Sequence, residues 1–236
     1  MALELCWASS DERRRRLPGD DLVLQPMRSI THAVTINAPP EAVWPWLIQM
    51  GSGRAGWYAY DHIDNGGRSS ARRIIPELQQ VAVGDVLPWL PGAQDGFVVG
   101  EVIPNAALIL LVPLQAAAGS SAAASSSSVP ALRVSWALVL APLAHGRTRL
   151  IARGRISRSW LAGQEARSTI PGKPIFIERI YGLLAKMPWP VLLPVAGVGH
   201  YLMESRMLRG IKHRVESRWA AEGADAEASS RRRVYQ

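Results

Sequence analysis

Four stretches rich in β-branched and aromatic residues follow one another between residues 96 and 156, and they constrain the possible folds more than any other feature. In chain order they read "GFVVGEVI", "ALILLVPL", "LRVSWALVLAPL" and "RTRLIARGRI". Such stretches predict β-strands, and the dipeptide His145-Gly146 predicts a hairpin between the last two. An earlier strand is expected at residues 28–37, where apolar and polar residues alternate. Consecutive strands of this kind favour an antiparallel sheet with one apolar face to cover.

A long helix near the C-terminus is the element that we expect to cover this face. Met203, Met207, Ile211 and Val215 recur at helical spacing, and Leu208 widens the apolar stripe. A shorter amphipathic helix is predicted at residues 39–50, which begins with two prolines. The fold class is therefore α+β, with a curved antiparallel sheet wrapped around a long C-terminal helix and a hydrophobic pocket between them.

We expect one domain, at residues 27–220. A weakly ordered segment, residues 1–26, precedes it, and a disordered basic tail, residues 221–236, follows it. Within the domain, the Ala/Ser-rich stretch 115–128 predicts a lengthened hairpin loop. The apolar, proline-rich segment 187–199 predicts either a kinked connection packed on the core or a lid that dips into a membrane interface.

The net charge of +8 limits the partners that we expect. Two arginine runs, Arg13–Arg16 and Arg231–Arg233, supply much of it. Their neighbours predict solvated tails, with attraction to an anionic membrane surface as the alternative, and no nucleic-acid-binding motif accompanies them. The single cysteine, Cys6, excludes an intramolecular disulfide, and no secretory signal pattern is present. We expect a cytoplasmic protein, with membrane association as the alternative.

A glycine-rich loop at residues 51–67 carries three aromatic rings, those of Trp57, Tyr58 and Tyr60. Arg54 and Asp61 flank these rings. Aromatic rings provide a large apolar area and, in tryptophan and tyrosine, a polar tip. Two interpretations stay open: the rings fill the core while Arg54 and Asp61 pair to hold the loop, or at least one ring contacts a ligand.

The strand at residues 147–156 places Arg149, Arg153 and Arg155 on one face. These side chains either lie on an ion-paired or solvated outer face, or neutralise acids such as Glu77 and Asp85. A third alternative is that they hold an anionic ligand. We single out Arg153 as the residue that holds an anion or a loop.

Residues for chemistry are few. His200 and Glu204 lie one helical turn apart, which favours a helix-surface hydrogen bond or a cap and leaves a general acid–base pair as the alternative. His32, His62, His145 and His213 show no metal-ligand spacing, and no nucleophile or phosphate-binding motif occurs. We therefore expect no metal and no cofactor. The weak catalytic candidates are Tyr58, Tyr60, Glu77, His200 and Glu204.

Seven motifs of the chain occur together in one known superfamily. They lie at Thr35–Leu47, Gln49–Asp61, Ile75–Gln79, Val83–Asp85, Ser135–Leu143, Gly146–Arg155 and His200–Lys212. With these motifs the chain resembles the SRPBCC superfamily, which comprises START-like, polyketide cyclase-like and pollen-allergen-like proteins. The resemblance covers roughly residues 28–218 and implies a helix-grip fold with a cavity for a hydrophobic or amphipathic ligand.

These observations lead us to expect binding or carriage of a hydrophobic small molecule or lipid, without catalysis. A cyclase- or dehydratase-type enzyme acting on a polyketide-like or aromatic substrate is one alternative, and a membrane-peripheral protein is another. The expected ligand contacts are Trp57, Tyr58, Tyr60, Trp136, Met203 and Met207.

Overall fold

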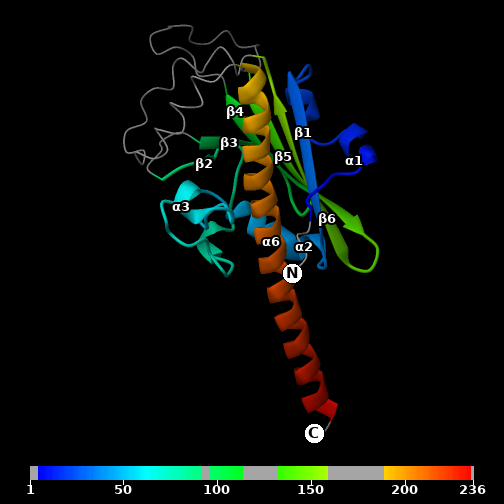
Figure 1. The fold of residues 1–236 in the computed structure, drawn as a ribbon. Coiled ribbons are helices and arrows are strands. Elements are labelled where there is room, and N and C mark those ends of the chain that lie inside the picture. The colour runs from blue at the N-terminus through cyan, green and yellow to red at the C-terminus, as the bar shows by residue number, and fades with distance from the viewer. Residues whose placement is uncertain (1–4, 92–95, 114–131, 159–188, 235–236) are drawn as a thin grey trace.

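The computed structural model describes residues 5–91, 96–113, 132–158 and 189–234. Six antiparallel strands form one open sheet in the order β1-β6-β5-β4-β3-β2, and a long C-terminal helix, α6, lies against one face (Figure 1). The strands are β1 (Arg28–Ile36), β2 (Val86–Pro88), β3 (Gly96–Ile103), β4 (Ala107–Pro113), β5 (Leu132–Leu143) and β6 (Arg147–Ile156). The α+β class and the strands expected from the sequence are confirmed.

The first strand of the sheet pairs with the last. β1 lies beside β6 along its whole length, with Arg28 opposite Ile156 and Ile36 opposite Thr148. β5 and β6 form the predicted hairpin, and three turn residues, Ala144, His145 and Gly146, join the two strands. His145 and Gly146 both have a φ of 63°, the left-handed geometry that short hairpin loops use.

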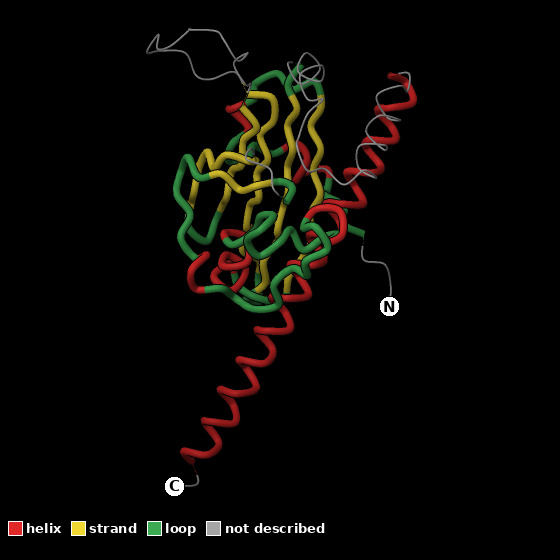
Figure 2. Tube along the Cα trace, turned by 90° about the vertical axis from the view of Figure 1, so that its left-hand side faces the viewer, coloured by secondary structure: helices red, strands yellow, loops and turns green. Residues whose placement is uncertain are grey.

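Helix α6 (Trp189–Val234) crosses the sheet face diagonally and continues past the end of the sheet (Figures 1 and 2). The predicted stripe is buried, with Met207, Leu208, Ile211 and Val215 all in the core. The backbone is already helical at Trp189, within the segment 187–199 expected to be a kinked connection or a lid. It stays helical to Val234, within the segment 221–236 expected to be a disordered tail. Leu202 and Trp219, away from the stripe, are exposed.

One helix and two single helical turns complete the α6 side of the sheet. α2 (Pro40–Ile48) begins with a proline, as predicted, and buries Trp46 and Leu47. The loop after it contains a single helical turn, α3 (Asp61–Asp64), and the next segment contains a 3₁₀ turn, η2 (Pro76–Leu78). These elements flank the lower part of α6 in Figure 1.

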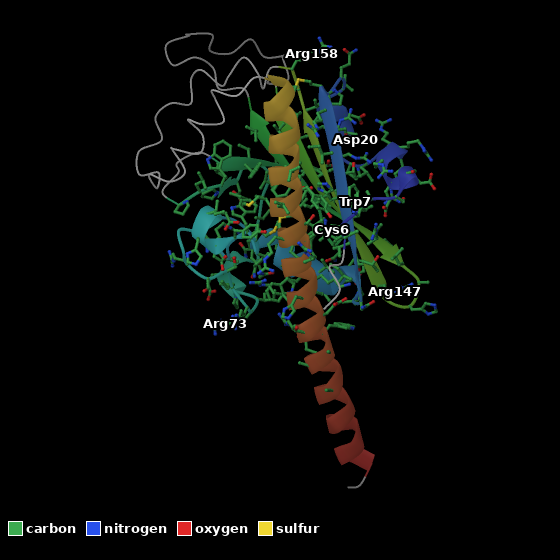
Figure 3. The ribbon with its side chains drawn as sticks, viewed as in Figure 1. Cys6, Trp7, Asp20, Arg73, Arg147 and Arg158 are labelled. Atoms are coloured by element: carbon green, nitrogen blue, oxygen red, sulfur yellow. The ribbon has the colours of Figure 1, made fainter. Side chains whose placement is uncertain are left out.

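From Leu5 onward the N-terminal segment is packed beside β1 (Figures 1 and 3), which corrects the expectation of weak order for residues 5–26 of the segment 1–26. Residues 10–14 form α1 (Ser10–Arg14), and residues 20–22 form η1 (Asp20–Leu22). Ala8 and Leu17 join a second apolar cluster on the sheet face opposite α6, with Ile109 and Ile151. The first arginine run is exposed, as expected for a solvated segment, but it also contacts its neighbours. Its contacts are Arg13 Nη1 to the Ala8 carbonyl at 2.7 Å, Arg14 to Asp11 at 2.6 Å, and Arg16 to Asp21.

Some expectations fall outside the part of the chain that the structure describes. These are the Ala/Ser-rich loop 115–128, and, for side chains, most of the segment 187–199 and the second arginine run. Among the residues described, no helix has both the length and the apolar composition needed to cross a membrane.

Candidate functional site

A buried carboxylate lies where α6 meets the sheet. Glu204 is 3% exposed, and its Oε2 contacts two imidazoles: it is hydrogen-bonded to His32 Nδ1 of β1, and it lies 3.4 Å from His200 Nε2. The other oxygen, Oε1, accepts a 2.8 Å hydrogen bond from Trp136 Nε1 of β5. The carboxylate thus links the helix to two strands through polar side chains.

The local patterns explain why these groups meet. Glu204 continues the buried stripe of α6 by one turn towards the N-terminus, because it lies four residues before Leu208. His32 lies on the same strand face as Val34 and Ile36, which are also in the core. A buried polar group requires a hydrogen-bond partner, and these two positions supply partners to each other.

The electrostatics favour an ionised carboxylate and a protonated imidazole. Burial opposes ionisation of Glu204, but the contacts with His200 and His32 outweigh it and lower the pKa of the carboxyl group. Burial also opposes protonation of His200, whereas the neighbouring Glu204 carboxylate outweighs it and raises the pKa of the imidazole. The positive charge of Arg28 acts against that increase. His200 and Glu204 can therefore share a proton between the imidazole and the carboxylate.

Aromatic rings form a wall beside this polar cluster. Trp136 lies 5.9 Å from Trp57 and 5.2 Å from Phe97 between ring centroids, and Phe97 lies 5.9 Å from Trp89. Trp57 is buried, whereas Trp89, Phe97 and Trp136 are half-buried. These rings therefore present accessible apolar area next to a hydrogen-bonded carboxylate. We call Trp57, Trp89, Phe97 and Trp136 the aromatic wall.

Gly154 of β6 leaves room next to the wall. It is opposite Trp136 on one side and Ile30 of β1 on the other, so its missing side chain would point towards α6. A Cβ atom placed there would meet no atom of the described residues within 4 Å. Among the described residues, the sheet therefore has an unfilled position on the α6 side, next to Trp136 and two residue pairs from His32.

The aromatic loop is largely structural. Tyr58 is 2% exposed, and its hydroxyl donates to the Trp46 carbonyl at 3.2 Å and accepts from Gln49 Nε2 at 2.8 Å. Burial raises the pKa of this hydroxyl, so it stays protonated. The Tyr58 backbone lies so close to α6 that a Cβ on Gly210 would approach its carbonyl oxygen to 2.2 Å. Of the three rings, only that of Trp57 belongs to the aromatic wall.

The remaining loop residues also lie away from Glu204. Tyr60 is 40% exposed. Arg54 does hold the loop, but it donates to the carbonyls of Met50 and Ile48, both at 3.0 Å. Asp61 accepts from the backbone and hydroxyl of Ser70. The expected pairing between Arg54 and Asp61 is thus replaced by separate contacts that close the helix end and the loop.

The arginines of β6 lie on the outer, ion-paired face. Arg149 pairs with Glu12 at 2.7 Å, and Arg153 pairs with Asp20 at 2.7 Å. Arg155 lies 3.5 Å from Asp20. The acids are those of the N-terminal segment, whereas Glu77 and Asp85 are exposed elsewhere. Arg153 therefore holds a segment of the chain.

Of the expected ligand contacts and catalytic candidates, the structure brings some together and separates others. Trp57 and Trp136 meet in the aromatic wall, and His200 and Glu204 meet with His32. Met207 is buried in the core, and Met203 is half-buried. His32 is not among the residues predicted for the site, because the histidines of the chain show no metal-ligand spacing. The signal that could have found it is a histidine on the apolar face of a strand and a glutamate on the apolar stripe of a helix.

Two surface hollows lie away from this cluster. One, of about 670 Å³, is lined by residues including Trp44, Ile48 and Asp85, and the other, of about 490 Å³, lies between α2 and α6 near Trp219. Neither hollow includes an expected ligand contact.

Comparisons with known proteins give no name for this arrangement. No protein-family model matches the chain, and no curated protein matches it. Two solved structures show a weak likeness. Protein MLL2253 from Mesorhizobium loti is 18% identical, with 80% of this chain and 98% of that chain covered and a TM-score of 0.35. Protein CV1439 from Chromobacterium violaceum is 15% identical, with 80% and 96% covered and a TM-score of 0.35.

Proposed function

We propose that this chain is a helix-grip protein of the SRPBCC type that binds a small, largely apolar organic molecule between the sheet and α6. The ligand would lie on the aromatic wall, over Gly154, with a polar group directed at the cluster around Glu204. The observation that carries this proposal is the buried, hydrogen-bonded carboxylate next to half-buried aromatic rings. Binding sites for small molecules combine mostly apolar walls with a few placed polar groups.

The energetic argument favours an apolar ligand. Burial of apolar area contributes about 25 cal/mol per Å², so covering the exposed parts of three rings would supply most of the binding free energy. Oε1 of Glu204 already accepts a hydrogen bond from Trp136, which aligns the carboxylate with the wall. A ligand that donates one hydrogen bond and carries an aromatic or aliphatic body suits these groups.

Two measurements test the proposal. Native mass spectrometry of freshly purified protein is expected to show a bound compound, or the empty protein is expected to bind the neutral probe N-phenyl-1-naphthylamine with an increase in fluorescence. Phe97→Ala should weaken probe binding by roughly 3- to 10-fold, because burying a whole phenylalanine side chain contributes about 1.5–3 kcal/mol and the ligand would cover about half of this one. The matched control is Trp219→Ala, which removes an exposed ring of α6. Equal binding by wild type and Phe97→Ala, or no binding by either, would refute the proposal.

One observation favours proton transfer as a second candidate function. A carboxylate with a lowered pKa that contacts two imidazoles is an acid–base arrangement, and general acid–base catalysis requires such groups at hydrogen-bond distance from the substrate. The test uses the compound that co-purifies. If wild type converts it and Glu204→Gln binds it without conversion, the protein is an enzyme of the cyclase or dehydratase kind. Binding without conversion by both proteins would exclude this candidate for that compound.

A further inference from the structure

We propose that His32, His200 and Glu204 form a binding site for one Zn²⁺ ion. Two imidazoles and one carboxylate are a ligand set that Zn²⁺ accepts when it has three protein ligands and a further position open to water or substrate. The three ligand atoms lie within 4.8 Å of one another, on β1 and α6. The inference goes beyond organic-ligand binding and does not depend on it.

The separations suit the size of the ion. Zinc bonds of about 2.0–2.1 Å in a tetrahedral site place neighbouring ligand atoms roughly 3.3 Å apart. His200 Nε2 lies 3.4 Å from Glu204 Oε2. The contact between His32 and Glu204 is a hydrogen bond, whose proton an ion would replace as it moves the two atoms apart. The required movement is a small rotation of side chains whose backbones are fixed in a strand and a helix.

An unsatisfied nitrogen is an independent indication. His200 Nε2 is buried and has no hydrogen-bond partner, although the ring as a whole is 39% exposed. A buried polar atom without a partner costs free energy that a ligand would recover. His200 Nε2 faces the Glu204 carboxylate. Their separation is too long for a good hydrogen bond but suits an ion bound between the two groups.

The surroundings also resemble the outer shell of a metal site. Ligating carboxylates in metal sites are themselves hydrogen-bonded, which fixes their orientation. Trp136 Nε1 makes this contact with Oε1 and leaves Oε2, the atom that faces both imidazoles, for the ion. A bound Zn²⁺ would add a Lewis acid next to the aromatic wall, suited to a ligand carbonyl or hydroxyl oxygen.

The test is a metal titration of the full chain after dialysis against a chelator. Zn²⁺ is titrated by calorimetry, and Co²⁺, which absorbs visible light when bound to nitrogen and oxygen ligands, is titrated by absorbance. We expect one equivalent of either ion to bind. His200→Ala, at a half-exposed position, should weaken binding by about 100-fold or more, and Trp136→Phe, which removes only the outer hydrogen bond, by about 10- to 100-fold.

Two further variants keep the result interpretable. His213→Ala removes an exposed imidazole from the same helix and should bind Zn²⁺ as the wild type does. Glu204→Gln keeps the shape of the side chain and an oxygen for Trp136, and it should change the Co²⁺ absorption spectrum while the circular dichroism stays the same. Absence of stoichiometric Zn²⁺ binding by the wild type, or equal binding by wild type and His200→Ala, would overturn the inference. The titration contains no organic ligand, so its failure leaves the proposed organic-ligand binding standing.

Discussion

Replacing Arg153 by methionine should strongly destabilise the protein, because this guanidinium is almost fully buried and every part of it is bonded. It is 2% exposed and donates to Asp20, Thr31 and the carbonyls of Glu12, Arg13 and Arg15. Methionine would preserve the apolar stem but leave the Asp20 carboxylate, 11% exposed, with a backbone hydrogen bond from Leu17 at 2.9 Å and the longer 3.5 Å ion pair with Arg155. Removing one partner of a buried ion pair costs about 3–5 kcal/mol.

For a chain of this length, 1 kcal/mol corresponds to about 2–4 °C in Tm, so Arg153→Met should lower the Tm by roughly 6–20 °C. The assay is thermal unfolding followed by circular dichroism, together with hydrogen exchange of residues 5–26, which should lose protection first. Arg147→Met, an exposed arginine of the same strand, is the control and should change little. Adding Asp20→Asn to Arg153→Met should cost much less than it costs alone, because the two groups interact directly. A Tm within about 2 °C of the wild type, with unchanged protection of residues 5–26, would refute the reasoning.

Three other changes test separate parts of the structure. The hydrogen bond and charge of Arg149 lower the pKa of the Glu12 carboxyl group from 4.5 to about 2. The contribution of this carboxylate to the free energy of unfolding is therefore complete above pH 4.5 and is lost as the pH falls towards 2. The stability of Glu12→Gln should depend less on pH over that interval, measured by acid titration of the circular dichroism signal. Gly154→Val should abolish binding of N-phenyl-1-naphthylamine by filling the space beside Trp136, yet leave Tm equal or higher, since glycine within a strand costs about 0.5–1 kcal/mol; unaltered probe binding would show that the ligand lies elsewhere. Leu208→Ala should cost about 2–5 kcal/mol in a urea titration, whereas Leu202→Ala, at an exposed position of the same helix, should stay within about 0.5 kcal/mol.

Local patterns predicted the elements of the fold because their causes are local. The strands of the β5–β6 hairpin follow from alternation and from the turn at His145 and Gly146. The burial of Leu208, Ile211 and Val215 follows from their spacing on α6. In contrast, the capping box of Ser9 and Glu12 is a local signal for α1 alone, and the packing of residues 5–26 on the sheet depends on arginines that lie more than 130 positions later in the chain.

Only part of the candidate site could be predicted, because one of its contacts joins residues that lie far apart in the sequence. The spacing of His200 and Glu204 is visible in the sequence, but their contact with His32 depends on how α6 crosses the sheet. The separation between His32 and Glu204 is 172 positions, so periodicity relates neither residue to the other. The sequence shows one polar residue on each of two apolar faces, His32 on a strand and Glu204 on a helix. Considered together, these two residues would have suggested a contact with each other.

The pairing of β1 with β6 sets the order in which the chain can fold during synthesis. About 110 residues separate the end of β1 from the start of β6, which corresponds to roughly 5–20 s at ribosomal rates of about 5–20 residues per second. Throughout that interval β1 has no neighbouring strand, and the N-terminal segment has none of its three arginine partners. Helix α6, which covers the sheet and completes the cluster around His32, emerges last. The apolar face of the nascent sheet therefore stays uncovered until helix α6 has been synthesised.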